Sequence, residues 1–116
     1  MNVREQILSK LRLKEDAEIE YKSAKGGFPQ SFWSTFSAFA NTDGGTIVLG
    51  VKEKNETFVP DGLTEEQATA YRKKFWDDAH NKACVSIPLL VESDVEEIKT
   101  DGGSYLLVFH VPRAPW

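Results

Sequence analysis

SFWSTFSAFANTDGGTIVLGV, residues 31–51 of a 116-residue chain, joins a helix-like pattern, a turn and a strand-like run. Aromatic side chains recur at three- and four-residue spacing from Phe28 to Phe39, which predicts a helix with one apolar face. We expect this helix to include Pro29 in its first turn, where a missing N–H is tolerated. The run at residues 46–51, TIVLGV, is short and rich in β-branched residues. It predicts a single strand buried on both faces.

The turn between helix and strand is NTDGG, residues 41–45, and its two glycines admit two interpretations. Gly44 and Gly45 can adopt positive φ or allow another backbone to approach closely. The turn then serves only to reverse the chain, or it also presents backbone N–H groups and small polar side chains to a partner. Phosphate binding by a P-loop is excluded, because a P-loop follows a strand, opens a helix and carries a Lys-Ser or Lys-Thr pair. Dinucleotide binding is excluded for the same reason.

The remaining sequence predicts an α+β fold in two layers, with helices on one face of a mixed sheet. Thr64 and Gln67 form a capping-box pattern, and the residues after them carry an apolar stripe at helical spacing. An Asp-Gly-Gly turn at 101–103 lies between two strand-like runs. The other expected elements are a short amphipathic helix at 3–12, a half-buried strand at 17–22, a charged turn at 52–56, a short strand at 57–59, a second helix from 64 to about 81, an irregular strand at 87–91, and a hairpin with arms 91–99 and 104–111.

Composition indicates one globular domain spanning residues 1–116. Hydrophobic residues make up 41% and charged residues 28%, which are ordinary values. No apolar run is long enough to span a bilayer, and the N-terminus lacks a signal-peptide core, so we expect no membrane partner. A single cysteine, Cys84, excludes an internal disulfide and fits a reducing compartment, which predicts a cytoplasmic protein. The proline-rich end at 112–116 leads us to expect a domain of a longer protein.

Charge is distributed unevenly along the chain, whose net charge is −4. This excludes a protein that coats nucleic acid through its overall field. Local basic groups remain: Lys22 and Lys25 flank the entrance to the aromatic helix, and Arg72–Lys74 form a second cluster. Hydroxyls, backbone amides and a few cations are the groups that position phosphates. The alternative is a solvated charged face, which is the commoner meaning of a charge run.

Carboxylates are concentrated before and within the first strand, where Glu15 and Glu20 belong to a group of four acids within six residues. Together with Glu53 after the next strand, they could hold a hard divalent cation and support phosphodiester cleavage. The spacing alone favours a solvated acidic rim. His80 and His110 have no spacing typical of a metal site built from nitrogen and sulfur ligands.

Three motifs resemble the Schlafen AlbA-2 domain. They are Glu15-x4-Glu20-Tyr21-Lys22, SAFANTDGG at residues 37–45 followed by Gly50-Val51, and a closing strand LVFHVPRA at 107–114. The resemblance runs from about residue 15 to 114. It implies an Alba-like α/β domain with a nucleic-acid-binding role, which in bacterial regulators stands N-terminal to further domains. Some Schlafen proteins are ribonucleases that use three acidic residues, and Glu15, Glu20 and Glu53 are the matching positions here.

These observations together predict a nucleic-acid-binding domain, with DNA as the expected ligand, in the N-terminal part of a longer bacterial-type transcriptional regulator. We expect a homodimer that needs no cofactor. Two alternatives stay open: a nuclease dependent on Mg²⁺ or Mn²⁺, and a dimerisation module. The expected nucleic-acid contacts are Lys22, Lys25, Asn41, Thr42, Gly44, Gly45, Arg72, Lys73 and Lys74.

Overall fold

The computed structural model describes residues 18–79 and 94–113, which form a two-layer α+β fold. The predicted helix at 3–12 and the predicted strand at 87–91 lie outside these residues. The elements in chain order are β1 (Ile19–Lys22), α2 (Phe32–Ala40), β2 (Gly45–Leu49), β3 (Val51–Lys54), β4 (Thr57–Pro60), α3 (Glu65–Ala79), β5 (Val95–Lys99) and β6 (Tyr105–Val111).

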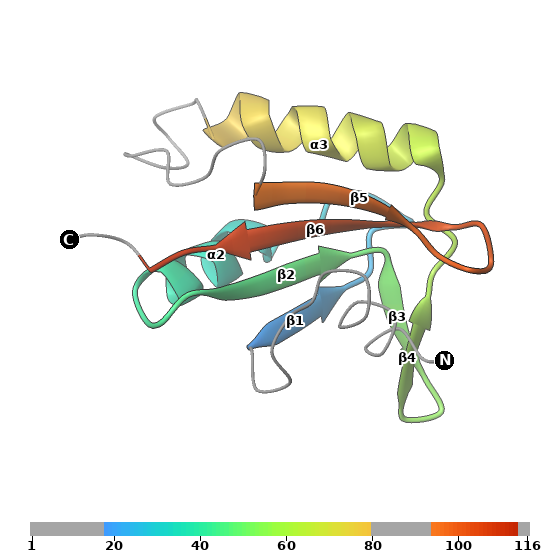
Figure 1. Cartoon of the computed structure of the whole chain (residues 1–116), viewed down its shortest axis with the longest axis horizontal. Coiled ribbons are helices and arrows are strands. Elements are labelled where there is room, and N and C mark those ends of the chain that lie inside the picture. Colours follow the sequence, from blue (N-terminus) through green and yellow to red (C-terminus); the bar gives the residue numbers. More distant parts are fainter. Residues whose placement is uncertain (1–17, 80–93, 114–116) are drawn as a thin grey trace.

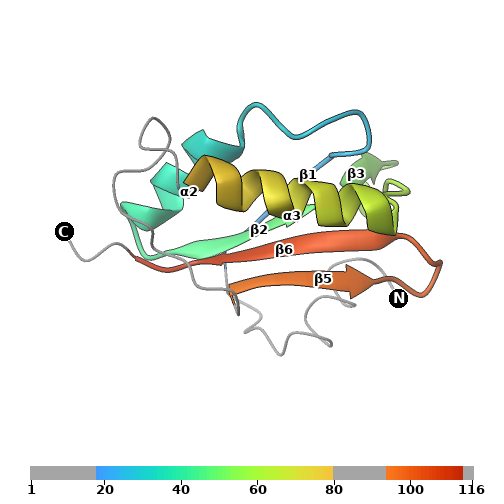
Figure 2. The same cartoon turned by 90° about the horizontal axis from the view of Figure 1, so that it is seen from above.

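Four of the strands form one mixed sheet in the order β1-β2-β6-β5. β1 runs parallel to β2, whereas the pairs β2–β6 and β5–β6 are antiparallel. β3 and β4 form a separate antiparallel hairpin, which turns away from the sheet at the end of β2 (Figure 1). Both helices lie over the same face of the four-stranded sheet, as the view from above shows (Figure 2). The predicted mixed sheet with helices on one face is thus confirmed.

Aromatic rings fill the space between the helices and the sheet. Phe109 of β6 lies at the centre, with ring centroids 4.8 Å from Phe32 of α2 and 4.7 Å from Phe75 of α3. All three side chains are fully or almost fully buried. The helical spacing of aromatic residues therefore marks the faces of α2 and α3 that pack on the sheet.

The opposite face of the sheet carries a second apolar cluster. Val48 of β2 and Val108 of β6 form its centre, and the half-buried Tyr21 of β1 packs against it. Successive strand residues point to opposite faces, so Glu20 and Lys22 lie on the helix side of β1 and Tyr21 on the other.

Three predicted elements have different bounds in the structure, each for an identifiable reason. The helix begins at Phe32, because Pro29 stands in a preceding turn where its carbonyl accepts a hydrogen bond from the Phe32 N–H (3.2 Å). The run 46–51 is not one strand, because Gly50 has φ +102° and the strand direction changes there. Of the predicted charged turn at 52–56, only Asn55 and Glu56 form a turn, because Lys52 to Lys54 pair with β4 as a hairpin arm.

The signals for α3 and for the closing hairpin are confirmed. The Gln67 N–H donates to Thr64 Oγ1 and the Thr64 N–H donates to Gln67 Oε1, both at 3.1 Å, which is the reciprocal capping box. β5 and β6 pair in register from Val95 with Phe109 to Lys99 with Tyr105. None of the helices within 18–79 and 94–113 is long and apolar enough to cross a membrane.

Candidate nucleic-acid interface

Lys22 is the last residue of β1 and lies beside the N-terminus of α2. Its Nζ donates to Ser31 Oγ at 2.8 Å. Ser31 is the N-cap residue of α2, yet its side chain makes no capping bond to the helix backbone, and the first turn contains no acidic residue. The positive end of the helix dipole and the Lys22 ammonium therefore produce a locally positive region.

Lys25 lies three residues further on, in the loop between β1 and α2. Its Nζ donates to the Gly62 carbonyl at 2.9 Å and lies 3.5 Å from Gln67 Oε1. An ammonium group has three donors, so Lys25 keeps capacity for an external acceptor. Lys22 and Lys25 form no ion pair with any residue in the described ranges, and Lys25 is exposed.

The glycine turn lies at the other end of α2 and is engaged with the helix. The Gly44 N–H donates to the Phe39 carbonyl at 2.9 Å, and Thr42 Oγ1 donates to the Ala38 carbonyl at the same distance. These bonds pair with carbonyl groups of the last helical turn, which have no hydrogen-bond partner within the helix itself. A helix of nine residues separates this turn from Ser31, which corresponds to roughly 13 Å.

The structure therefore does not join all predicted contacts into one region. Asn41, Thr42, Gly44 and Gly45 stand at the C-terminal end of α2, while Lys22 and Lys25 stand near its N-terminal end. Added Cβ atoms would lie 2.6 Å from the Val111 carbonyl oxygen at Gly44 and 2.7 Å from the Phe39 ring at Gly45. Packing thus accounts for both glycines without a ligand. Contact between this turn and nucleic acid stays a prediction.

The basic cluster on α3 carries its own counter-charges. Lys73 Nζ lies 3.2 Å from Asp77 Oδ2, and Lys74 Nζ lies 3.0 Å from Asp78 Oδ2. Arg72 Nη1 is 3.7 Å from Glu97 Oε1 of β5. Since each cation has an acid beside it, this helix attracts a polyanion less than the number of its basic residues indicates.

The three predicted catalytic carboxylates are not united in the described residues. Glu20 lies on the helix side of β1. Val51 packs in the apolar cluster on the opposite face of the sheet. Glu53 stands two residues later in β3, so it lies on the same side of that strand as Val51 and not on the side of Glu20. Residues 18–79 and 94–113 contain no group of three or more acidic, histidine or cysteine side chains that could hold a metal. Glu15 lies outside these residues, so its role stays a prediction.

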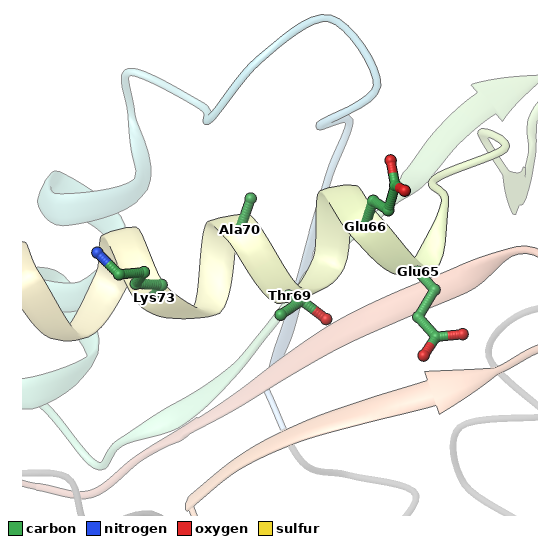
Figure 3. A pocket seen from close by; sticks show the side chains of 5 residues that line it. All are labelled: Glu65, Glu66, Thr69, Ala70 and Lys73. Atoms are coloured by element: carbon green, nitrogen blue, oxygen red, sulfur yellow. The ribbon is translucent and has the colours of Figure 1, made fainter.

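A shallow hollow on the outer surface of α3 is lined by Glu65, Glu66, Thr69, Ala70 and Lys73 (Figure 3). Two carboxylates at its rim make it unsuitable for phosphate. Glu65 Oε2 accepts a hydrogen bond from the Tyr105 hydroxyl at 3.0 Å. This bond, together with desolvation and the charges of Glu65 and Glu97, raises the pKa of Tyr105.

The Glu65 bond gives a prediction for alkaline pH. Because the pKa of Tyr105 is higher in the folded state, the bond stabilises the fold below the ordinary tyrosine pKa of about 10, and this stability is lost as pH rises through the folded-state pKa. Glu65→Gln is expected to move the pKa of Tyr105 back toward its ordinary value. Tyrosinate absorbance during alkaline titration measures the shift, and Tyr105→Phe assigns it. An unchanged titration in Glu65→Gln would contradict the assignment.

The fold and these sites define an Alba-like α+β domain, and sequence comparison assigns the family. The profile of the Schlafen AlbA_2 family matches residues 15–115. The chain therefore belongs to the Schlafen AlbA_2 family. A comparison with curated proteins gives no match.

A solved structure with the same fold comes from Nitrosomonas europaea. It is the solution NMR structure of the N-terminal domain of a protein described as related to the ATP-dependent DNA helicase RecG. The two chains share 28% sequence identity, with a TM-score of 0.60. The match covers 98% of this chain and 75% of that one.

Proposed function

We propose that this domain binds nucleic acid, with DNA as the first candidate, through the loop that joins β1 to α2. The observation that carries the proposal is the contrast between two sets of cations. The ammonium groups of Lys22 and Lys25 bond only to neutral oxygens of the described residues, whereas the side chains of Arg72, Lys73 and Lys74 each form an ion pair with a carboxylate. The first pair keeps its charge available for phosphate.

Geometry favours the same loop. Lys22 and Lys25 are held by hydrogen bonds to Ser31 Oγ and to the Gly62 carbonyl, so part of their conformational freedom is already lost before binding. The N-terminus of α2 adds a positive dipole end beside Lys22. A protein with net charge −4 needs such a local positive surface to approach a polyanion.

The comparisons support the nucleic-acid class of ligand. The chain belongs to the Schlafen AlbA_2 family, and it is similar to the N-terminal domain of a protein described as related to a DNA helicase. We further propose that the domain serves a longer transcriptional regulator in the cytoplasm. A homodimer would present two such loops, and two linked contacts bind more tightly than one.

The proposal is tested by titrating the protein against labelled duplex DNA at several salt concentrations from about 50 to about 200 mM. Replacing both lysines, as Lys22→Gln with Lys25→Gln, is expected to reduce the slope of log K against log salt by about 1.8, because two phosphate contacts are lost. The matched control is Lys73→Gln with Lys74→Gln, which removes the same charge from α3 and is expected to change the slope much less.

Two results would overturn the proposal. Wild-type protein that binds neither DNA nor RNA at the lowest salt would exclude nucleic-acid binding, because phosphate contacts are strongest there. Equal losses from the two double variants would show that net charge, and not the loop, controls binding. RNA of the same sequence, run in parallel, decides whether DNA is preferred.

A further inference from the structure

Asp61, between β4 and α3, connects to the loop after β1 across 36–38 residues of sequence. Its Oδ2 accepts three hydrogen bonds from consecutive residues: from Ser23 Oγ at 2.9 Å, the Ala24 N–H at 3.0 Å and the Lys25 N–H at 3.1 Å. Bonds from backbone N–H groups to a carboxylate are charge-assisted and stronger than neutral ones. One carboxylate oxygen therefore holds the start of the loop, through the Ser23 side chain and the backbone of Ala24 and Lys25.

The first turns of α3 hold the same segment from a second side. The Tyr71 hydroxyl donates to the Ala24 carbonyl at 2.7 Å, and Gln67 Nε2 donates to the Lys25 carbonyl at 3.1 Å. Ala24 is 1% exposed and belongs to the main core. The loop runs along α3 in the view from above (Figure 2). The backbone at Ala24 and Lys25 is therefore bonded both to Asp61 and to α3.

The carboxylate of Asp61 acts on the loop through its Oδ2 atom. Its second oxygen, Oδ1, is buried and has no hydrogen-bond partner among the described residues. Its negative charge also stands close to the loop that, in the proposed function, meets phosphate.

We propose that Asp61 is the positioning residue of this interface. It touches no nucleic acid; it holds the backbone from Ser23 to Lys25 so that the ammonium of Lys25, anchored on the Gly62 carbonyl, faces the ligand in one geometry. This inference rests on the proposed function. The inference extends the proposed function, because it makes Asp61, a residue with the same sign of charge as nucleic acid, a determinant of binding affinity.

The sign of the charge provides a sharp test. If only electrostatics mattered, removing a carboxylate near the interface would strengthen DNA binding. The positioning role predicts the opposite: Asp61→Ala weakens DNA binding by about tenfold, because the loop must then be ordered on binding. Asp61→Asn removes the charge but keeps an oxygen acceptor. It is expected to bind duplex DNA within about twofold of wild type, or more tightly.

The experiment uses the duplex DNA titration described above with four further proteins. They are Asp61→Ala, Asp61→Asn, the matched control Ser23→Ala, which removes one of the three bonds, and Asp61→Ala combined with Lys25→Gln. Ser23→Ala is expected to have a small effect. In the Lys25→Gln background Asp61→Ala is expected to add little, because Asp61 acts through Lys25. Hydrogen exchange of the Ala24 and Lys25 amides should accelerate in Asp61→Ala and stay slow in Asp61→Asn.

Each outcome decides. If Asp61→Ala binds as well as wild type, or its loss is fully additive with Lys25→Gln, the positioning role is wrong while the proposed function stands. If Asp61→Ala fails to fold, Asp61→Asn decides through binding and hydrogen exchange read together. The inference is overturned if Asp61→Asn binds about tenfold more weakly while the Ala24 and Lys25 amides stay slow, or if these amides exchange faster without any loss of binding. If wild type does not bind, the proposed function fails and the inference falls with it, so the two failures are distinguished by the wild-type titration.

Discussion

Replacing Phe75 with alanine is expected to lower the free energy of unfolding by about 3–5 kcal/mol. Phe75 is 1% exposed. Its ring lies 4.7 Å from that of Phe109, 5.4 Å from that of Trp33 and 5.7 Å from that of Phe32, measured between centroids. The substitution removes ring contacts of α3 with both α2 and the sheet. A cavity remains because the aromatic neighbours cannot collapse into it fully.

Urea unfolding measures the loss, and Phe58→Ala is the matched control. Phe58 is 39% exposed and contacts Tyr21 with a centroid distance of 4.5 Å. The same chemical change there creates no enclosed cavity, so we expect a loss of about 1 kcal/mol. Similar losses in the two variants would contradict the assignment of Phe75 to the centre of the core.

Local sequence signals predicted the parts of the fold that local chemistry determines. The capping box at Thr64 and Gln67 and the apolar stripe after it located α3, because both depend on residues three or four positions apart. The Asp-Gly-Gly turn at 101–103 located the closing hairpin in the same way. Helices and tight hairpins are readable from sequence because their determinants are adjacent in the chain.

The β3–β4 hairpin was predicted only in part: the sequence placed a turn within 52–56 and a strand after it, but it missed β3. Its turn consists of Asn55 and Glu56, with φ of 51° and 66°. Such turns usually carry glycine at the second position, and Glu56 gives no such signal. The break before it, at Gly50, is imposed by tertiary packing: an added Cβ would lie 2.7 Å from the Tyr105 carbonyl oxygen. A contact with a strand more than fifty residues later cannot be read from the run itself.

The residues of the candidate site also differ in whether local sequence could identify them. Lys22 and Lys25 could be chosen from their place before the aromatic helix, but Asp61 could not, because its Pro-Asp-Gly context reads as an ordinary turn. The pairing of Lys73 with Asp77 was visible at i,i+4 spacing and reduces the weight of that basic cluster.

Gly44→Ala is expected to destabilise the domain by about 3 kcal/mol or more. Gly44 has φ +84°, where an L residue is strained, and an added Cβ would lie 2.6 Å from the Val111 carbonyl oxygen. That oxygen belongs to the β6 backbone, so it cannot move without disturbing the pairing of Gly45 with Val111. Strain and a backbone clash therefore act together at this residue, and urea unfolding measures their sum.

Two other glycines separate these causes. Gly103 has φ +91° with nothing within 4 Å of its added Cβ, so Gly103→Ala is expected to cost only the backbone strain, about 1–2 kcal/mol. Gly26 has an equally open position without positive φ, and Gly26→Ala is expected to change stability by less than about 1 kcal/mol. A loss at Gly44 no larger than at Gly103 would show that the clash is absent. If Gly44→Ala instead reduced DNA binding without reducing stability, the turn would have to be counted as a contact surface rather than as the joint between α2 and the sheet.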